Sequence, residues 1–403
     1  MLNNISICIA TAIVCTLSAS ACVNEKVPDN GGLSELTGLS REEAEDVRER
    51  IISDWKAGLK DEMEHNLDRL YVEDNDHHRM RFLVDVYGEE PEGGHSLWIS
   101  LHGGGGTTAA MNDGQWKNQQ EMYRRAVPPQ PAEGYYISPR AIADEWNMWF
   151  FKENDKLFEE IITTMVVTRD VNPDKVYLMG YSAGGDGVWR MAPRMADHWA
   201  AAAMMAGHPG SVNLMNVRNM PFTLWVGAED AAYDRNTEVP RKAGELDELR
   251  NGDSDGYIHN CNVLEGKPHW MDLKDAAAFP WMAKYTRNPY PARIVWRQEN
   301  EESMALRPFF YWIKIDREEM KNGRTVIAEI KDNTVYIEKS DYKTLTIYLN
   351  DKLVDLDSEV SVIYNGRQLF KGHVSRDGKT IAATLTERND PSFAFCSEIT
   401  VKL

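Results

Sequence analysis

The segment Gly180-Tyr181-Ser182-Ala183-Gly184 constrains the fold of this chain more than any other part of the sequence. The four apolar residues 176–179 directly before it predict a short buried strand, and helical spacing follows it. A serine between two glycines at such a junction is typical of a sharp turn that holds the serine side chain above the end of a sheet. We therefore expect a sheet whose strands lead directly into helices.

Predicted strands and helices alternate through the middle of the chain. Such alternation is typical of an α/β fold, in which a mostly parallel sheet has helices on both faces. We assign this catalytic domain to residues 80–290. Its predicted strands are residues 81–86, 96–101, 135–138, 175–179, 200–205 and 222–226, and its predicted helices include residues 156–165 and 188–195.

The regions on either side of this domain have different patterns. Ser40-Arg41-Glu42-Glu43 has the spacing of a capping box, and apolar residues then recur once per helical turn as far as Leu67. Residues 40–79 are therefore predicted to be an N-terminal helical segment that packs on the main domain. Residues 291–403 contain short strand candidates and the hairpin signal Asn365-Gly366, which predict a small all-β, sandwich-like domain.

The N-terminus has the pattern of an export signal. Residues 5–21 are apolar and uncharged, and they end in Ala19-Ser20-Ala21 followed by Cys22. We predict a signal peptide over residues 1–21, lipidation of Cys22 and a tether over residues 22–39. The alternative is a transmembrane anchor, but the small residues at the end of the segment favour cleavage. The expected location is outside the cytoplasm, as a bacterial lipoprotein in the periplasm or on the cell surface, attached to the membrane through its N-terminal lipid.

Charge and cysteine content narrow the partners. The formal net charge is −18, from 63 acidic and 45 basic side chains, and such a surface repels phosphate backbones, so no nucleic-acid partner is expected. Only Cys261 and Cys396 remain after the predicted lipidation site. Whether they form a disulfide is left open, because a sequence carries no distance between them.

A second glycine-rich segment, His102-Gly103-Gly104-Gly105-Gly106, follows the predicted strand 96–101. Glycines allow backbone N–H groups to approach a substrate oxygen, so we predict an oxyanion hole formed by Gly104 and Gly105 together with Ala183. A phosphate-binding loop is the alternative, but the Gly-Lys-Ser/Thr ending of that motif is missing.

The acid and the base of a serine nucleophile follow it in the order Ser, Asp, His in this type of sheet. Asp230 comes just after the predicted strand 222–226 and is our candidate for the acid, with Asp234 and Glu229 as alternatives. Ser182 is the candidate nucleophile.

His269 is our candidate for the base, because it lies in a turn-rich stretch beyond Asp230. His259 is the alternative. His373 falls in the predicted β region, and His208 precedes the acid and is expected to be a pocket residue.

The glycine-rich segment at residues 101–105 and the segment Gly180–Gly185 resemble the polyhydroxybutyrate-depolymerase and feruloyl-esterase branch of the α/β-hydrolases, with prolyl-oligopeptidase-like enzymes as near relatives. The resemblance covers roughly residues 81–285. It implies hydrolysis of carboxylic esters, in a small molecule or a polymer, without a metal or an organic cofactor. A peptidase and a non-catalytic surface binding protein are the alternative functions.

Two further groups of residues have competing interpretations. Trp146, Trp149, Phe150 and Phe151 either stack on a ring of the substrate or, as we favour, belong to the core. His77-His78 among acidic residues has the composition of a metal-binding pair, but no third ligand has a fitting spacing, so a solvated turn is favoured and no metal site is predicted.

Overall fold

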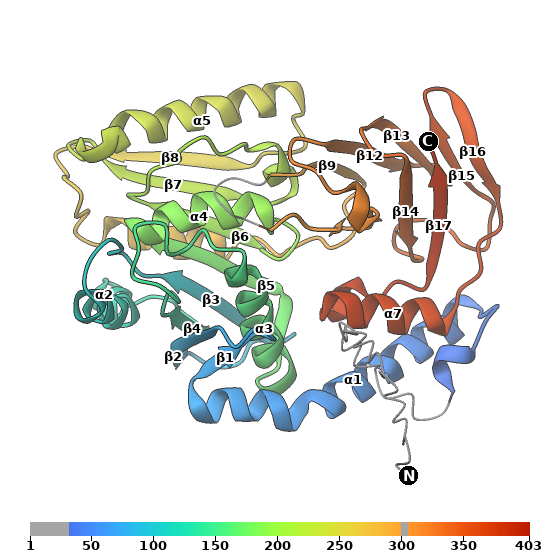
Figure 1. Ribbon diagram of the computed structural model, residues 1–403, viewed down its shortest axis with the longest axis horizontal. Coiled ribbons are helices and arrows are strands. Elements are labelled where there is room, and N and C mark those ends of the chain that lie inside the picture. Colours follow the sequence, from blue (N-terminus) through green and yellow to red (C-terminus); the bar gives the residue numbers. More distant parts are fainter. Residues whose placement is uncertain (1–31, 300–304) are drawn as a thin grey trace, which may run out of the picture.

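The computed structural model describes residues 32–299 and 305–403 (Figure 1). The predicted signal peptide and the predicted lipidation site Cys22 lie outside the described residues. Within the described ranges, no helix combines the length and the apolar character needed to cross a membrane.

An eight-stranded sheet forms the centre of the larger unit, in the order β1-β2-β4-β3-β5-β6-β7-β8. The strands from β4 to β8 in this order run parallel, whereas β2 is antiparallel to both of its neighbours. The predicted mostly parallel sheet is thereby confirmed. Its strands are β1 (Tyr71–Glu73), β2 (Arg79–Tyr87), β3 (His95–Leu101), β4 (Gly134–Pro139), β5 (Val171–Tyr181), β6 (Ala201–Met205), β7 (Phe222–Gly227) and β8 (His259–Leu264).

Helices cover both faces of this sheet, as predicted. Along β5, Val176 and Leu178 pack into the core layer under α3, α4 and α5, whereas Tyr177 and Met179 pack into the layer under α2 and α6. Successive side chains of a strand point to opposite faces, so a strand buried on both faces is apolar throughout. The helices are α2 (Ala109–Met122), α3 (Glu153–Thr168), α4 (Ala183–Arg194), α5 (Arg235–Gly252) and α6 (Ala278–Met282).

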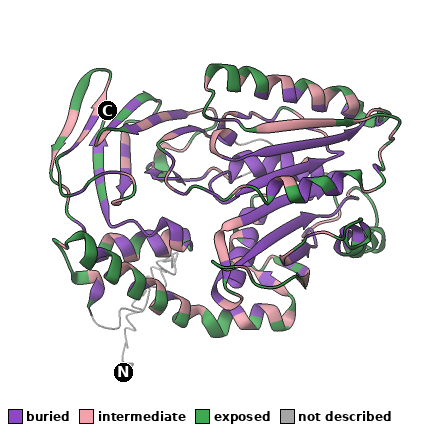
Figure 2. Cartoon of the chain, turned by 180° about the vertical axis from the view of Figure 1, so that it is seen from behind, coloured by how far each residue is buried: buried purple, intermediate pink, exposed green. Residues whose placement is uncertain are grey.

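Helix α1 (Arg41–Arg69) begins at the predicted capping box, where the Ser40 hydroxyl accepts from the Glu43 N–H and the Glu43 carboxylate accepts from the Ser40 N–H. Its apolar stripe is buried, and its outer face is polar and exposed (Figure 2). The helix packs on α3 and also on α7 (Gly378–Arg388), so it contacts the C-terminal region as well as the main domain (Figure 1). The strand β1 lies inside the segment that the sequence predicted to be helical.

The C-terminal region contains two packed sheets, which confirms a β-rich unit beside the main sheet (Figure 1). Asn365 and Gly366 both have positive φ in the turn between β15 and β16, as the hairpin signal predicts. Helix α7 was not predicted, although Ile381 and Leu385 have helical spacing and are buried. One sheet contains β9 (Arg293–Arg297), β12 (Thr325–Lys331), β13 (Thr334–Ser340), β15 (Val360–Tyr364) and β16 (Arg367–Gly372), and the other contains β10 (Phe309–Phe310), β11 (Ile313–Lys314), β14 (Thr344–Leu349) and β17 (Ser397–Lys402).

The interface between the two units contains buried ion pairs. Arg388 of α7 donates to the Asp197 carboxylate at 2.5 Å, and both side chains are almost completely buried. Arg287 donates to Asp390 at 2.7 Å across the same interface. Charges removed from water in this way stabilise a structure only when each has a partner, and the pairing shown here meets that requirement.

The two cysteines of the described chain are both free. Cys261 lies in β8 of the main sheet, and Cys396 is buried just before β17 in the C-terminal unit. The structure therefore answers the open question: these thiols do not form a disulfide.

Candidate active site

Ser182 lies at the turn between β5 and α4 with φ 58° and ψ −121°, a strained conformation for a residue with a side chain. The two glycines of the motif are needed because the chain folds closely on itself here. A Cβ atom on Gly180 would lie 2.4 Å from the Gly184 carbonyl oxygen, and a Cβ on Gly184 would lie 2.1 Å from the Leu101 oxygen. The Ser182 N–H donates to Met205 O at 2.9 Å, which ties the turn to the neighbouring strand β6.

The structure brings together the predicted nucleophile, base and acid. His269 Nε2 lies 3.0 Å from Ser182 Oγ, and His269 Nδ1 lies 2.7 Å from Asp230 Oδ2. The three residues follow β5, β8 and β7, and the carboxyl ends of parallel strands meet at one edge of a sheet. Asp230 is 2% exposed, whereas the His269 side chain is 43% exposed. A buried acid therefore orients a base that solvent reaches.

The alternative acids lie elsewhere. Glu229 uses its backbone N–H to bind Lys267 O at 2.9 Å, and no contact joins its carboxylate to His269. Asp234 is exposed at the start of α5 with φ 56°. Among the three candidates, Asp230 is the one that contacts the base.

The alternative bases are also separate from Ser182. His259 lies at the start of β8, where its Nε2 is 3.1 Å from Asp247. His373 is exposed beyond β16. His208 follows β6, and its Nδ1 accepts from the Gly210 N–H at 3.1 Å.

The predicted oxyanion residues differ in whether the backbone N–H is already bound inside the protein. Ala183 contributes the first N–H of α4, which has no partner inside the helix. The loop after β3 passes beside the nucleophile, since a Cβ on Gly103 would lie 3.1 Å from Ser182 Cβ. The Gly105 N–H, however, donates to Asn112 Oδ1 at 2.9 Å. The prediction for Gly105 is therefore corrected: this N–H is used to hold the loop, and Gly104 and Ala183 remain the candidate donors.

Two buried side chains hold the oxyanion loop in place. Asn112 in the first turn of α2 binds the loop and donates in turn to Asp144 Oδ1 at 2.8 Å, and Arg140 also contacts that carboxylate. His102 Nδ1 lies 2.7 Å from Gly103 O, and its Nε2 accepts from the Ala141 N–H at 3.2 Å. Burial lowers the pKa of His102 to about 4. The neutral ring supplies one donor and one acceptor, which is what these two bonds require.

Tyr181 connects the nucleophile to the loop that carries the base. Its hydroxyl donates to His269 O at 2.6 Å and accepts from the Met271 N–H at 3.1 Å. Burial, with a contribution from nearby carboxylates, raises the pKa of Tyr181 well above its usual range, so the hydroxyl keeps its proton. The residue beside Ser182 thus holds the backbone on both sides of Trp270.

Sequence reasoning missed the roles of Tyr181, Asn112 and Arg140. Tyr181 occupies the variable position of the motif, and Asn112 and Arg140 lie in a helix and a loop with no motif of their own. The sequence held a weak signal for Asn112, because a polar side chain in the first helical turn after a glycine-rich loop is well placed to bind that loop.

The predicted core assignment of the aromatic group holds for part of it. Trp149 and Phe150 are buried in the core beside α3 and α4, whereas the Trp146 side chain is exposed. Phe151 is intermediate. One member of the group therefore remains available to a substrate.

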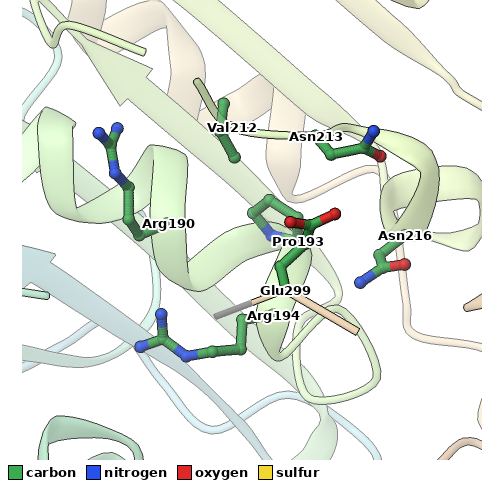
Figure 3. Close-up of a pocket in the computed structure, with 7 residues that line it drawn as sticks. All are labelled: Arg190, Pro193, Arg194, Val212, Asn213, Asn216 and Glu299. Atoms are coloured by element: carbon green, nitrogen blue, oxygen red, sulfur yellow. The ribbon is translucent and has the colours of Figure 1, made fainter. Parts of the chain in front are cut away.

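A small cavity of about 20 Å³ lies near the opposite end of α4 from Ser182, and Figure 3 shows its lining residues. Its lining includes Pro193 and Arg194, at the last residues of the helix. Twelve helical residues span roughly 18 Å at 1.5 Å per residue. This cavity is therefore separate from the nucleophile.

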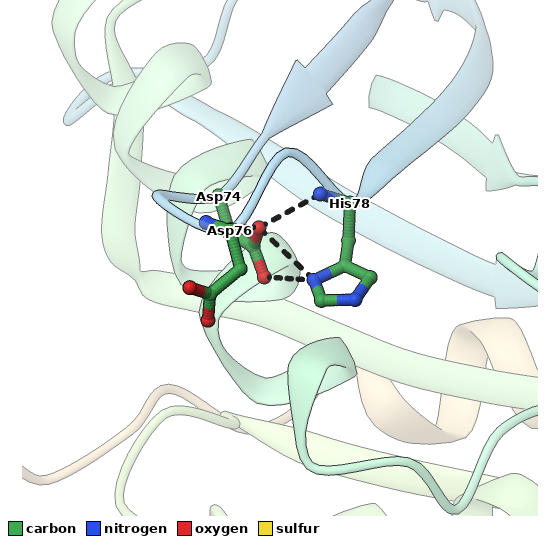
Figure 4. A group of neighbouring side chains, drawn as sticks. All are labelled: Asp74, Asp76 and His78. Carbon is green, nitrogen blue, oxygen red and sulfur yellow. Dashed lines mark hydrogen bonds and ion pairs between the residues drawn. The ribbon is translucent and has the colours of Figure 1, made fainter.

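Asp74, Asp76 and His78 form a group whose possible metal-ligand atoms lie within 4.8 Å of one another (Figure 4). The Asp74 carboxylate accepts from the backbone N–H groups of Asp76 and His78 at 2.9 and 2.8 Å, and it contacts the His78 ring at 2.9 Å. These bonds close the turn between β1 and β2. The expectation that no third ligand lies near the histidines is corrected, because Asp74 and Asp76 both lie beside His78, whereas His77 is not part of the group.

The fold and the site together define a class of protein. The sheet is mostly parallel with helices on both faces, Ser182 lies at a strand-to-helix turn, and Asp230 and His269 follow later strands in the order Ser, Asp, His. This is the α/β-hydrolase fold, and the predicted fold class is confirmed.

No protein-family model and no curated protein matches this sequence. Solved structures with similarity to it include a thermostable esterase, 16% identical, where the match covers 54% of this chain and 62% of that chain with a TM-score of 0.42. A ferulic acid esterase is 18% identical, with 53% and 96% covered and a TM-score of 0.39. A mutant feruloyl esterase module from Clostridium thermocellum complexed with sinapinate is 13% identical, with 51% and 88% covered and a TM-score of 0.35. Identities this low transfer no substrate or residue role to this chain.

Proposed function

We propose that this protein is an exported serine hydrolase that cleaves carboxylic esters through an acyl-enzyme on Ser182. The observation that carries the proposal is the hydrogen-bonded series from Ser182 Oγ to His269 Nε2 at 3.0 Å and from His269 Nδ1 to Asp230 Oδ2 at 2.7 Å. A serine hydroxyl is a weak nucleophile unless a base removes its proton, and a base is effective when a third group orients it.

The first half of the reaction forms the acyl-enzyme. With its Nδ1 proton donated to Asp230, His269 presents the Nε2 lone pair to the Ser182 hydroxyl. Ser182 Oγ attacks the ester carbonyl carbon while His269 takes the hydroxyl proton. The carbonyl oxygen gains negative charge, which the N–H groups of Gly104 and Ala183 stabilise; such donors contribute roughly 3 kcal/mol each. The carbon–oxygen bond to the alcohol then breaks, and His269 returns the proton to the leaving oxygen.

The second half repeats these steps with water. His269 removes a proton from a water molecule, whose oxygen attacks the acyl carbon attached to Ser182. The bond to Ser182 Oγ breaks, and His269 gives the proton back to the serine. This chemistry uses no group beyond the described side chains and backbone N–H groups.

The substrate that we favour is an ester in a carbohydrate or a polymer, and the place of action is the periplasm or the cell surface. Export and lipid attachment rest on the apolar residues 5–21 and on Cys22. An enzyme held at a surface meets substrates too large to enter the cell, which agrees with a base that is open to solvent.

The test uses the chain from residue 23 onward and its Ser182→Ala variant. Hydrolysis of p-nitrophenyl acetate and methyl ferulate is measured together with labelling by a fluorophosphonate. We expect hydrolysis and labelling by the native protein and neither by the variant. Hydrolysis of peptide amides in preference to esters would support a peptidase instead. No hydrolysis and no labelling of Ser182 would favour a surface binding protein.

A further inference from the structure

Exposed aromatic side chains are concentrated around the catalytic residues. Within residues 32–299 and 305–403, four Trp, Tyr or Phe side chains are exposed: Trp146 at 60%, Tyr233 at 76%, Trp270 at 42% and Tyr336 at 41%. The first three adjoin the oxyanion loop, the acid and the base, and we call them the aromatic rim. Large aromatic side chains are mostly buried, so three exposed ones at one site call for a physical reason.

Trp146 lies against the oxyanion loop. A Cβ on Gly105 would be 3.2 Å from Trp146 Cα, and a Cβ on Gly106 would be 3.7 Å from Trp146 Cβ. Its ring lies nearly perpendicular to that of the buried Phe150, with ring centroids 5.5 Å apart. The backbone and part of the ring of Trp146 are therefore anchored, while most of its surface faces solvent.

Trp270 and Tyr233 lie on the other side of the site. Trp270 follows His269 directly, and its ring centroid is 5.9 Å from that of Tyr181, the residue before the nucleophile. Tyr233 comes three residues after Asp230, and the Arg235 guanidinium lies 4.9 Å from its ring centroid. Arg235 is itself 3.7 Å from Asp230. Both rings are thus held by residues of the catalytic centre.

The strand order separates the two sides. Ser182 follows β5; the oxyanion loop and the segment with Trp146 follow β3 and β4 on one side of it, and Asp230 and His269 follow β7 and β8 on the other. A substrate ester bound at Ser182 therefore has Trp146 on one side and Trp270 with Tyr233 on the other.

We propose that the aromatic rim is a two-sided binding site for planar rings, in which Trp146 binds a ring in the acyl group and Trp270, with Tyr233, binds a ring in the leaving alcohol. The proposal rests on the proposed ester hydrolysis. Aromatic faces gain about 0.5–1.5 kcal/mol from ring stacking beyond the apolar area that they bury. The substrates are therefore esters with a planar or flat-faced ring on each side of the ester bond.

The chemistry decides which side binds which group. His269 must deliver a proton to the leaving oxygen, so the alcohol lies beside His269 and hence beside Trp270. The carbonyl oxygen points to the N–H groups of Gly104 and Ala183. The acyl substituent takes the remaining direction, away from His269 and along the oxyanion loop to Trp146.

The test compares matched pairs of esters in the native protein, Trp146→Ala and Trp270→Ala. The acyl pair is methyl 3-phenylpropionate and methyl propionate; the alcohol pair is 2-phenylethyl acetate and ethyl acetate. For each pair the ratio of kcat/KM for the ring ester to that for the ring-free ester is measured. We expect Trp146→Ala to lower the acyl ratio about five- to tenfold and Trp270→Ala to lower the alcohol ratio by a similar factor, from the loss of one stacked ring.

Tyr336→Ala is the matched control, because Tyr336 is an exposed aromatic residue of β13 in the C-terminal unit. It should leave both ratios at their native values. Fluorophosphonate labelling of Ser182 in every variant shows that the nucleophile is intact, and Trp146→Leu, which keeps an apolar side chain without a ring, should lower the acyl ratio as well.

The outcomes separate the two proposals. One contrary result is that the native protein hydrolyses these esters while the two variants keep the native ratios; another is that Trp146→Ala lowers the alcohol ratio and Trp270→Ala the acyl ratio. Either result overturns the two-sided rim and leaves ester hydrolysis standing. If the native protein neither hydrolyses an ester nor reacts with the fluorophosphonate, ester hydrolysis fails and the rim proposal fails with it.

Discussion

The catalytic edge of the main sheet and the interface between the two units use polar side chains in opposite ways. At the interface, Asp197 is buried against Arg388 and His198, so each charge has a partner of opposite sign or a hydrogen-bonding ring. At the catalytic edge, Asp230 Oδ1 has no hydrogen-bond partner among the described residues, and the His269 side chain is half-exposed. The interface gives each buried charge an ionic partner, although Arg388 Nε and Arg307 Nε make no hydrogen bond among the described residues, whereas the catalytic edge leaves one oxygen of the acid and much of the base open.

The difference follows from what each region must do. A buried charge without a partner is costly, so a region that only holds two units together gains from pairing its charges. An active site must keep donors and acceptors free for atoms that are present only during the reaction. The strained turn at Ser182 and the open groups around it are consistent with that use.

Helix α4 contacts both regions. Its first N–H, at Ala183, directly follows the nucleophile. Arg194 at its other end binds the buried Asp155 of α3 at 2.8 Å, and Asp155 lies 3.9 Å from Arg307 of the interface. Ion pairs therefore hold α4 at its C-terminal end, and the N-terminal end of the same helix forms part of the active site. Substitutions at the catalytic edge should change rates with little effect on stability, and those at the interface should do the reverse.

The largest expected effect is that of Asp230→Asn on turnover. An amide at this position favours the wrong tautomer of His269 and removes the charge that stabilises the imidazolium, so kcat should fall roughly 10⁴-fold. The free energy of unfolding should fall by less than in the interface variant Arg388→Met, because the amide keeps the shape of the side chain and Arg235 lies 3.7 Å from the carboxylate, longer than the 2.5 Å contact of Arg388 with Asp197. Steady-state kinetics and denaturant unfolding measure the two quantities. Asp234→Asn is the control and should keep native turnover; a large fall in that variant instead would transfer the role of the acid to Asp234.

The next effect is on stability and comes from Arg388→Met. This change leaves Asp197 buried without its guanidinium partner, which costs about 3–5 kcal/mol of the free energy of unfolding. Urea denaturation followed by fluorescence measures the loss, and kcat of the folded fraction should stay near the native value.

Arg41→Met provides the matched control, because Arg41 forms exposed ion pairs with Asp351 and Asp355. Its cost should be at most about 1 kcal/mol. Equal losses in the two arginine variants would remove the contrast between a buried and an exposed ion pair.

A smaller effect is expected for Tyr181→Phe, which keeps the ring but removes the hydroxyl that binds His269 O and the Met271 N–H. Two backbone groups lose a partner, so the base should be held less well and kcat should fall about tenfold, the equivalent of one buried hydrogen bond. Tyr177→Phe is the matched control: Tyr177 lies in the same strand, and its hydroxyl donates to Tyr285 O at 2.9 Å. If both variants lose the same activity, the effect of Tyr181 is structural and not catalytic.

The smallest effect concerns pH and His198, which faces Asp197 at 3.0 Å, Glu159 at 3.5 Å and Arg307 at 3.5 Å. Burial alone would lower the pKa of His198, but attraction to Asp197 and the hydrogen bonds to both carboxylates outweigh burial and Arg307 and raise it. A raised pKa in the folded state stabilises the protein below the unfolded value of about 6.5, and this stabilisation is lost as the pH rises through the folded value.

This prediction is checked by measuring the free energy of unfolding of the native protein and of His198→Gln from pH 6 to pH 9. The native protein should have the larger free energy of unfolding at pH 6, and its difference from the variant should shrink as the pH rises. Asp197 is expected to show the opposite dependence, because its pKa is lowered and its contribution is lost at acid pH: burial acts to raise that pKa, and the charges of His198 and Arg388 outweigh it. An advantage that grows with pH would contradict the assignment for His198.

Much of the site could be predicted because its residues follow local rules. The motif around Ser182 lies in five consecutive residues, and the order of Asp230 and His269 along the chain follows from the order of the strands. The helix start at Ser40 and the turn at Asn365-Gly366 depend on residues within one turn of each other. Such features need no knowledge of distant contacts.

Other features could not be predicted because they depend on which distant residues meet. Trp146 and Trp149 lie three residues apart with similar side chains, yet one is exposed and the other is packed under α3 and α4. The use of the Gly105 N–H by Asn112 required the position of α2 relative to the loop. Helix α7 was missed because its length and position are stabilised by packing on α1.

The sequence by itself determined the strand–serine–helix turn, the alternating architecture and the order of the three candidate catalytic residues, because propensity, periodicity and backbone sterics act between near neighbours. Only the tertiary structure decided that His269 meets Ser182 across 87 positions of chain, that Tyr181 holds the loop of the base, and that the charges of Asp197 and Arg388 are buried together. Those contacts depend on how whole elements pack, since the free energy of a buried polar group is set by the partner that the fold brings to it.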